Sequence, residues 1–118
     1  MDNKEFSKVL EKRTLQFAVA VIRMSASLPD TTEGRVIRNQ ITKSGTSIGA
    51  NYREANRSRS KPDFKNKITI SESEASETCY WTEIIEAMNW SAPDKIQQIE
   101  KEAQELLAIF TSIGKSLN

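Results

Sequence analysis

The stretch Pro93–Leu117, PDKIQQIEKEAQELLAIFTSIGKSL, decides the fold. Its apolar residues recur at intervals of three and four, which is the heptad spacing that places side chains on one face of an α-helix. They are Ile96, Ile99, Ala103, Leu106, Phe110, Ile113 and Leu117. Most of the residues between them are polar or charged, so this segment predicts an amphipathic helix with one face in a hydrophobic core.

Three similar segments precede it, separated by prolines at Pro29, Pro62 and Pro93. Proline is tolerated at the start of a helix but not in its interior, so these residues divide the chain into four pieces. We predict helices over about residues 2–28, 33–58, 62–90 and 94–117. Short connections favour antiparallel neighbours, so we expect an all-α, antiparallel up-down-up-down four-helix bundle. The 118 residues suit a single domain over residues 1–118.

The predicted core faces differ in side-chain size. The first segment offers Phe6, Leu10, Phe17, Val21, Met24 and Leu28. The second offers the smaller and more polar set Ile37, Ile41, Ser44, Ile48, Asn51 and Ala55, with Gly45 and Gly49 beside it. Small residues allow neighbouring helices to approach closely, and this offsets the low helix propensity of glycine.

The third segment carries two stripes of residues at helical spacing, although a monomeric bundle needs only one. The first stripe is Phe64, Ile68, Ser71, Ala75, Thr78, Thr82 and Ile85, and the second is Ile70, Glu74, Glu77, Trp81, Ile84 and Met88. The second stripe either fills the core or meets another subunit. Aromatic residues and methionine are enriched at interface centres, so we expect Trp81, Ile84 and Met88 to form an oligomer interface.

Composition excludes several classes of site. The chain has no histidine, which is the commonest general base and metal ligand, and its only cysteine is Cys79. We therefore expect no catalytic residues, no metal, no cofactor and no small-molecule substrate. No apolar run is long enough to span a membrane, and the first residues, Met1–Glu5, do not resemble a signal peptide. We expect a cytoplasmic protein without membrane partners.

Charge is nearly balanced at +1 but is unevenly distributed. Residues 35–67 contain nine basic and two acidic residues, whereas residues 72–105 contain two basic and nine acidic ones. Either the two zones pair across helices, or part of the basic zone forms a phosphate-binding patch. The residues of this candidate RNA-binding patch, called the basic patch below, are Arg53, Arg57, Arg59, Lys61, Lys65 and Lys67.

Polar residues at helical spacing also predict a network between the second and third helices. Its members are Asn51, Glu54, Arg57, Glu74 and Glu77. A polar residue at a seam position fixes the register of helices at some expense of stability, so a structural role is the simpler interpretation.

The run Ile41–Ala55, ITKSGTSIGANYREA, is followed by Arg57 and Phe64. It resembles the bacterial four-helix bundle proteins named for the intervening sequences of 23S ribosomal RNA genes. In that family a small-residue helix ends in an Asn-x-x-Glu-Gly/Ala motif, matched here by Asn51, Glu54 and Ala55, and a following helix bears a Ser-x-x-Glu element. Ser71 with Glu74, or Ser73 and Glu74 with Glu77, match that element.

The resemblance covers about residues 15–113 and implies a homopentamer. A more distant relative is the accessory protein of diversity-generating retroelements, which binds nucleic acid and a reverse transcriptase. That relative is strongly basic, whereas this chain is nearly neutral. Together, the basic patch and the family resemblance indicate a non-enzymatic, homo-oligomeric scaffold that binds structured RNA, with ribosomal RNA as a candidate. The alternative is a protein–protein interaction adaptor whose basic residues only pair with acidic ones.

Overall fold

The computed structural model describes residues 2–118, which form four α-helices joined by short loops. They are α1 (Asn3–Ser25), α2 (Thr32–Ala55), α3 (Lys61–Ala87) and α4 (Pro93–Ser116). No strand forms within the described residues, so the prediction of an all-α chain with four helices is confirmed. No helix in this part of the chain is both long and apolar enough to cross a membrane.

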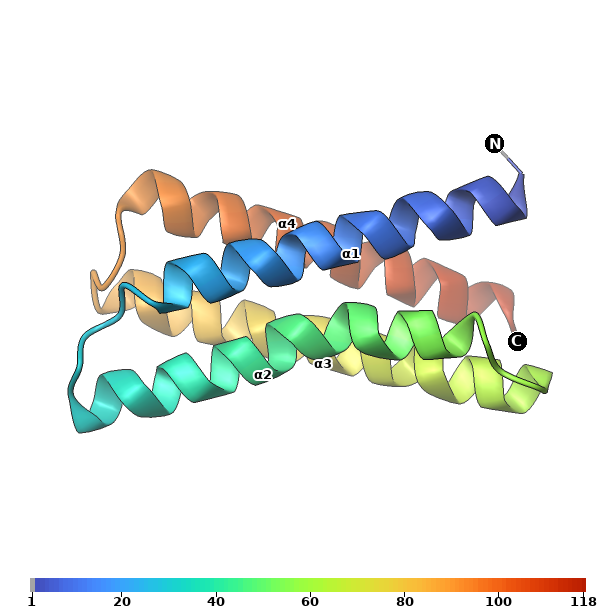
Figure 1. Cartoon of the computed structure of the whole chain (residues 1–118), viewed down its shortest axis with the longest axis horizontal. Helices are drawn as coiled ribbons and strands as arrows, with labels where there is room; N and C mark the ends of the chain where they lie inside the picture. Colours follow the sequence, from blue (N-terminus) through green and yellow to red (C-terminus); the bar gives the residue numbers. More distant parts are fainter. Residues whose placement is uncertain (1) are drawn as a thin grey trace.

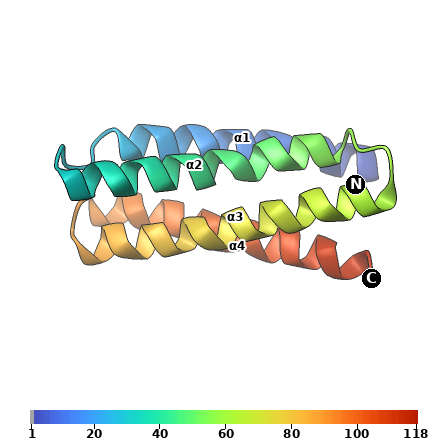
Figure 2. The same cartoon turned by 90° about the horizontal axis from the view of Figure 1, so that it is seen from below.

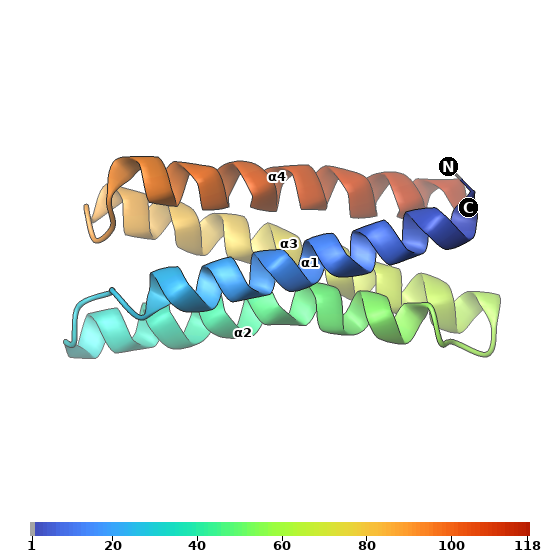
Figure 3. The same cartoon turned by 45° about the horizontal axis from the view of Figure 1, so that its top comes forward.

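The helices form an elongated particle of 44 × 26 × 20 Å. Each helix packs against two others, in the pairs α1–α2, α2–α3, α3–α4 and α1–α4. Figure 1 shows each helix running in the opposite direction to the one before it. Figure 2 shows α1 and α2 as one layer and α3 and α4 as the other. Both termini therefore lie at the same end as the α2–α3 loop, as Figure 3 also shows.

Side-chain caps fix three of the four helix starts. The side chains of Asp2, Thr31 and Ser60 accept hydrogen bonds from the backbone N–H groups three residues ahead. Such caps satisfy amide groups that have no partner inside the helix. The fourth helix has no side-chain cap and begins with Pro93, which has no N–H to satisfy.

The first three helices end three residues before their predicted ends, and after α1 and α3 a tight turn keeps an apolar residue against the core. After α1, the Leu28 N–H donates to Ser25 O at 3.1 Å, and Leu28 is buried although it lies outside the helix. After α3, Asn89 adopts a left-handed backbone with φ of 55°. Asparagine tolerates that conformation better than most residues, and it stops the helix.

The core contains large apolar side chains from all four helices. Ile41, Ile48, Ile85, Leu106 and Phe110 are completely buried. The rings of Tyr52 and Phe110 meet edge to face at 5.4 Å between centroids, so side chains of α2 and α4 touch across the core.

Two predicted core residues are exposed. Phe6 is 41% exposed and Leu117 is 38% exposed, so their assignment to the core was wrong. Both lie at the end of the bundle that holds the termini, where fewer neighbouring residues cover a side chain (Figure 1).

Hydroxyl groups line the contact between α2 and α3. Ser71 Oγ donates to Ile48 O at 2.9 Å, and Thr78 Oγ1 donates to Ser44 Oγ at 2.9 Å. All three hydroxyl-bearing residues are buried. Hydrogen bonding removes most of the free-energy penalty of burying them, while their small size lets the two helices approach closely.

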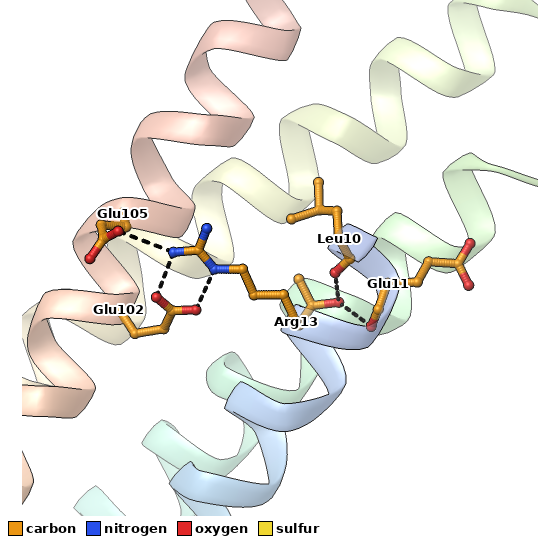
Figure 4. A network of polar contacts seen from close by, with 6 residues as sticks. Leu10, Glu11, Arg13, Glu102 and Glu105 are labelled. Carbon is orange, nitrogen blue, oxygen red and sulfur yellow. Dashed lines mark hydrogen bonds and ion pairs between the residues drawn. The ribbon is translucent and has the colours of Figure 1, made fainter. Parts of the chain in front are cut away.

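One arginine provides the main polar link between α1 and α4. Arg13 donates through Nε and Nη2 to the two carboxylate oxygens of Glu102, both at 2.6 Å, and through Nη2 to Glu105 at 3.2 Å (Figure 4). The hydrogen bond to Glu102 raises the pKa of the Arg13 guanidinium above its ordinary value. A two-point contact of this kind also fixes the relative position of the two helices.

Acidic residues gather where the second half of α3 meets the first half of α4. Burial raises the pKa of Glu100, and Glu86 and Glu83 raise it further. One carboxylate oxygen of Glu100 is buried and accepts no hydrogen bond from residues 2–118. Burial, Glu100 and Glu83 also raise the pKa of the half-buried Cys79, which favours its unreactive thiol form.

The contact between α1 and α2 depends on Gly49. A Cβ at this position would lie 2.8 Å from Thr14 Oγ1 and 2.9 Å from Thr14 Cβ. We expect Gly49→Ala to lower the free energy of unfolding by about 1–3 kcal/mol, because crowding outweighs the better helix propensity of alanine. Thermal and urea unfolding followed by circular dichroism would measure the change.

Gly114→Ala is the matched control, because nothing lies within 4 Å of a Cβ at Gly114. We expect it to leave stability unchanged or raise it by up to about 1 kcal/mol through helix propensity. Equal effects of the two substitutions would contradict the close α1–α2 packing.

The raised pKa of Glu100 predicts a pH-dependent effect. Because its pKa is higher in the folded state, Glu100 favours folding below its unfolded pKa and loses this contribution as pH rises through the folded pKa. Glu100→Gln should therefore raise the free energy of unfolding at pH 7 and have little effect below about pH 4, where the carboxyl is protonated. Urea unfolding at both pH values would test this, and equal effects at both would contradict it.

Candidate nucleic-acid interface

The basic patch surrounds the loop between α2 and α3. This loop contains only five residues, Asn56–Ser60, and Ser60 caps α3 by accepting from Asp63 N at 3.1 Å. The short connection carries the basic residues from the last turns of α2 to the first turns of α3. All six predicted residues therefore lie toward one end of the bundle (Figure 1).

Three members of the basic patch contact other side chains. Arg53 pairs with Glu11 on α1 at 3.4 Å, and Lys67 pairs with Glu54 on α2 at 3.2 Å. Lys65 donates to the side-chain oxygen of Asn118. Part of the predicted patch is thus engaged within the chain.

The other three members, Arg57, Arg59 and Lys61, are exposed and have no side-chain partner within residues 2–118. Arg57 and Arg59 line a shallow depression of about 510 Å³ together with Glu54, Asp63 and Lys67. The available positive charge is therefore concentrated in the loop.

The bundle brings four more basic residues to the same end. Lys4, Lys8 and Lys12 lie in the first half of α1, and Lys115 lies in the last turn of α4. All four are exposed. The sequence analysis missed them because they are far from residues 53–67 along the chain. The predicted alternation of helix direction could have revealed them, because it brings the start of the first helix and the end of the fourth to the end that holds the second loop.

The predicted polar network does not form between its five members. Asn51 donates to Ser47 O of its own helix at 2.9 Å, and Glu77 accepts from Trp81 Nε1 at 3.3 Å. Glu54 pairs with Lys67. The hydroxyl contacts of Ser71 and Thr78 join α2 to α3 instead.

Glu74 is half-buried near Glu77 and Lys43. Burial raises its pKa most, Glu77 raises it further, and Lys43 lowers it. Within residues 2–118 no three acidic or cysteine side chains lie close enough to hold a metal ion.

The predicted interface residues differ in exposure. Trp81 and Ile84 are half-buried, with Trp81 packed against the core, and Met88 is 52% exposed. Another exposed apolar row lies on α1, at Leu15, Val19 and Ile22. Its spacing of four and three residues was visible in the sequence, but the stronger core stripe of the same helix obscured it.

Comparisons with known proteins agree with this architecture. The family model described as 23S rRNA-intervening sequence protein matches residues 8–112. A crystal structure at 1.70 Å of a protein with unknown function from the S23 ribosomal protein family of Bacteroides thetaiotaomicron VPI-5482 is similar, with a TM-score of 0.82 and 35% sequence identity. The similarity covers 89% of this chain and 97% of that one. No curated protein matches the chain.

The motif from Asn51 to Phe64 lies inside the matched region, and the resemblance inferred from it is confirmed. With four helices and a match over nearly its whole length, the chain belongs to the 23S rRNA-intervening sequence protein family.

Proposed function

We propose that this protein is a non-enzymatic, homo-oligomeric scaffold in the cytoplasm that binds structured RNA through the basic end of its bundle, with ribosomal RNA as a candidate ligand. The observation that carries the proposal is the group of exposed cations, Arg57, Arg59 and Lys61, that lack a carboxylate partner within residues 2–118. Unpaired arginine and lysine side chains attract phosphate groups.

The antiparallel up-down-up-down arrangement is part of this proposal, because it enlarges the positive surface. It places Lys4, Lys8 and Lys12 at the same end as the α2–α3 loop. An oligomer would present several such ends to one RNA molecule and strengthen binding through multivalency. By family resemblance the oligomer is a pentamer, and Trp81, Ile84 and Met88 contribute to its contacts.

Binding would depend on the phosphate backbone and on RNA shape. Phe64 in α3 is half-buried against the core, and it lines a surface depression together with Arg59 and Lys61. A single half-buried ring beside these cations gives recognition of base sequence little support.

The adaptor hypothesis is favoured by one specific observation. Arg53 and Lys67 form ion pairs with Glu11 and Glu54, which is the internal pairing that this alternative requires. These pairs are partly exposed, so each contributes about 0–1 kcal/mol at most. They leave Arg59 and Lys61 available for phosphate groups.

Salt dependence of RNA binding distinguishes the two functions. If all six residues of the basic patch contact phosphates, a plot of log affinity against log salt concentration should have a slope of about −4 to −5. The double variant Arg59→Ala, Lys61→Ala should reduce the steepness by about 1.5–2 and weaken binding to all RNA sequences alike. Fluorescence anisotropy with labelled structured ribosomal RNA fragments would measure both.

The double variant Arg23→Ala, Lys101→Ala is the control, because it removes the same charge from exposed positions away from the basic end. We expect it to retain the full slope. Absence of RNA binding by the unsubstituted protein at low salt would reject the RNA proposal and favour the adaptor.

A further inference from the structure

A groove of about 410 Å³ lies between α1 and α2. Much of its lining is small or apolar, contributed by Thr14, Leu15, Ala18, Thr46, Gly49 and Ala50. It lies on the layer formed by α1 and α2, which Figure 2 shows opposite the layer of α3 and α4. A groove with this lining suits a large side chain with an apolar body.

Two arginines and two glutamates complete the lining of the groove, and they differ in whether they already form ion pairs within the chain. Glu11 already pairs with Arg53 and accepts from Asn56, and Glu54 already pairs with Lys67. Arg57 has no such partner within residues 2–118. The available charge at the groove is therefore positive.

Exposed apolar side chains continue the groove along α1. Leu15 is 51% exposed, Val19 is 38% exposed and Ile22 is 48% exposed. Their spacing places them on the same side of the helix. The groove and this row form one face with an apolar centre, which we call the groove face.

The opposite layer carries a side chain of complementary character. Tyr80 on α3 is 56% exposed, the largest exposed fraction among the large apolar residues of the described chain. Glu72 and Glu77 line the shallow surface beside it. Glu72 accepts from Thr111 and Glu77 accepts from Trp81, and neither pairs with a cation within residues 2–118.

We propose that the groove face binds a second copy of this chain, with Tyr80 of one copy inserted into the α1/α2 groove of the next. Arg57 then faces the carboxylates of Glu72 and Glu77 on the neighbouring copy. Tyrosine and arginine are common centres of binding energy in protein interfaces. This inference rests on the oligomeric part of the proposed function, which it deepens by naming the two surfaces.

The two surfaces belong to different layers, so the contact is heterologous. Each copy uses its groove face toward one neighbour and its Tyr80 face toward the other. Repetition of such a contact gives a closed ring or an open chain, whereas a contact between two groove faces would stop at a dimer. Arg59 and Lys61 lie outside the groove and remain available to RNA, whereas Arg57 contributes to the contact between copies.

Cysteine cross-linking tests the pairing. With Cys79→Ser as background, Ala50→Cys places a thiol in the groove and Ser76→Cys places one beside Tyr80, both at exposed positions. A short bis-maleimide should join the double-cysteine protein into a ladder of covalent multimers on a denaturing gel. Each single-cysteine protein should run on the same gel at the mass of one chain. A control with Val36→Cys in place of Ala50→Cys should give no ladder, because Val36 is exposed on α2 outside the groove.

Tyr80→Ala in the double-cysteine protein should abolish most of the ladder, while Tyr80→Phe should retain it. Circular dichroism would verify that both variants remain helical. Cross-linking of the Ala50→Cys protein alone would show a groove-to-groove contact and overturn the inference.

Light scattering on the unsubstituted protein tests whether an oligomer forms, independently of whether Tyr80 makes the contact. An oligomer whose double-cysteine variant gives no ladder would overturn the Tyr80 contact and leave the scaffold standing. A mass of 13.3 kDa, that of one chain, would overturn both.

Discussion

The close approach of α2 to its neighbours is the constraint on which the rest of the structure depends. Toward α1, Gly49 lies against Thr14 with no space for a methyl group. Toward α3, the hydroxyls of Ser44, Ser71 and Thr78 replace larger apolar side chains and bond to one another or to the backbone. Because α2 carries small side chains toward α1 and α3, both neighbours lie close to its axis. The large side chains on its core-facing side then contact those of α4 across the core.

This packing also determines where the charged residues lie. Because α2 packs closely against α3, its last turns lie near the first turns of α3, and a loop of five residues is enough to join them. The cations Arg57 and Arg59 consequently lie on a small surface, which they share with Glu54, Asp63 and Lys67. A long, mobile loop would have allowed the same residues to find acidic partners. The proposed RNA site is thus a product of tight helix packing as much as of local composition.

The sequence predicted the features that depend on periodicity. Heptad spacing identified the core residues of α4, and the three prolines identified the positions of the loops. Helix ends were less predictable, since the turn after α1 keeps Leu28 buried outside the helix. An apolar residue that continues the helical spacing is therefore predicted to belong to the helix even when it lies in the turn that follows.

Side-chain partners were the least predictable feature. Asn51 was expected to reach across to α3, but an asparagine inside a helix can bond to the carbonyl one turn earlier, and here it does so. The sequence offered no means of choosing between the two acceptors. The cations of α1 and α4 were missed for a different reason, because their proximity to the basic patch arises only when the whole bundle is assembled.

The seam between α1 and α4 has a consequence for motion. This pair shares the smallest contact of the four adjoining pairs, and Arg13 supplies its main polar link. Regions with few buried contacts open before the whole protein unfolds. The bundle should therefore open as a three-helix body with a hinged first helix, so that amide hydrogens of α1 exchange with solvent sooner than those of the other three. The same opening would momentarily separate the two walls of the α1/α2 groove.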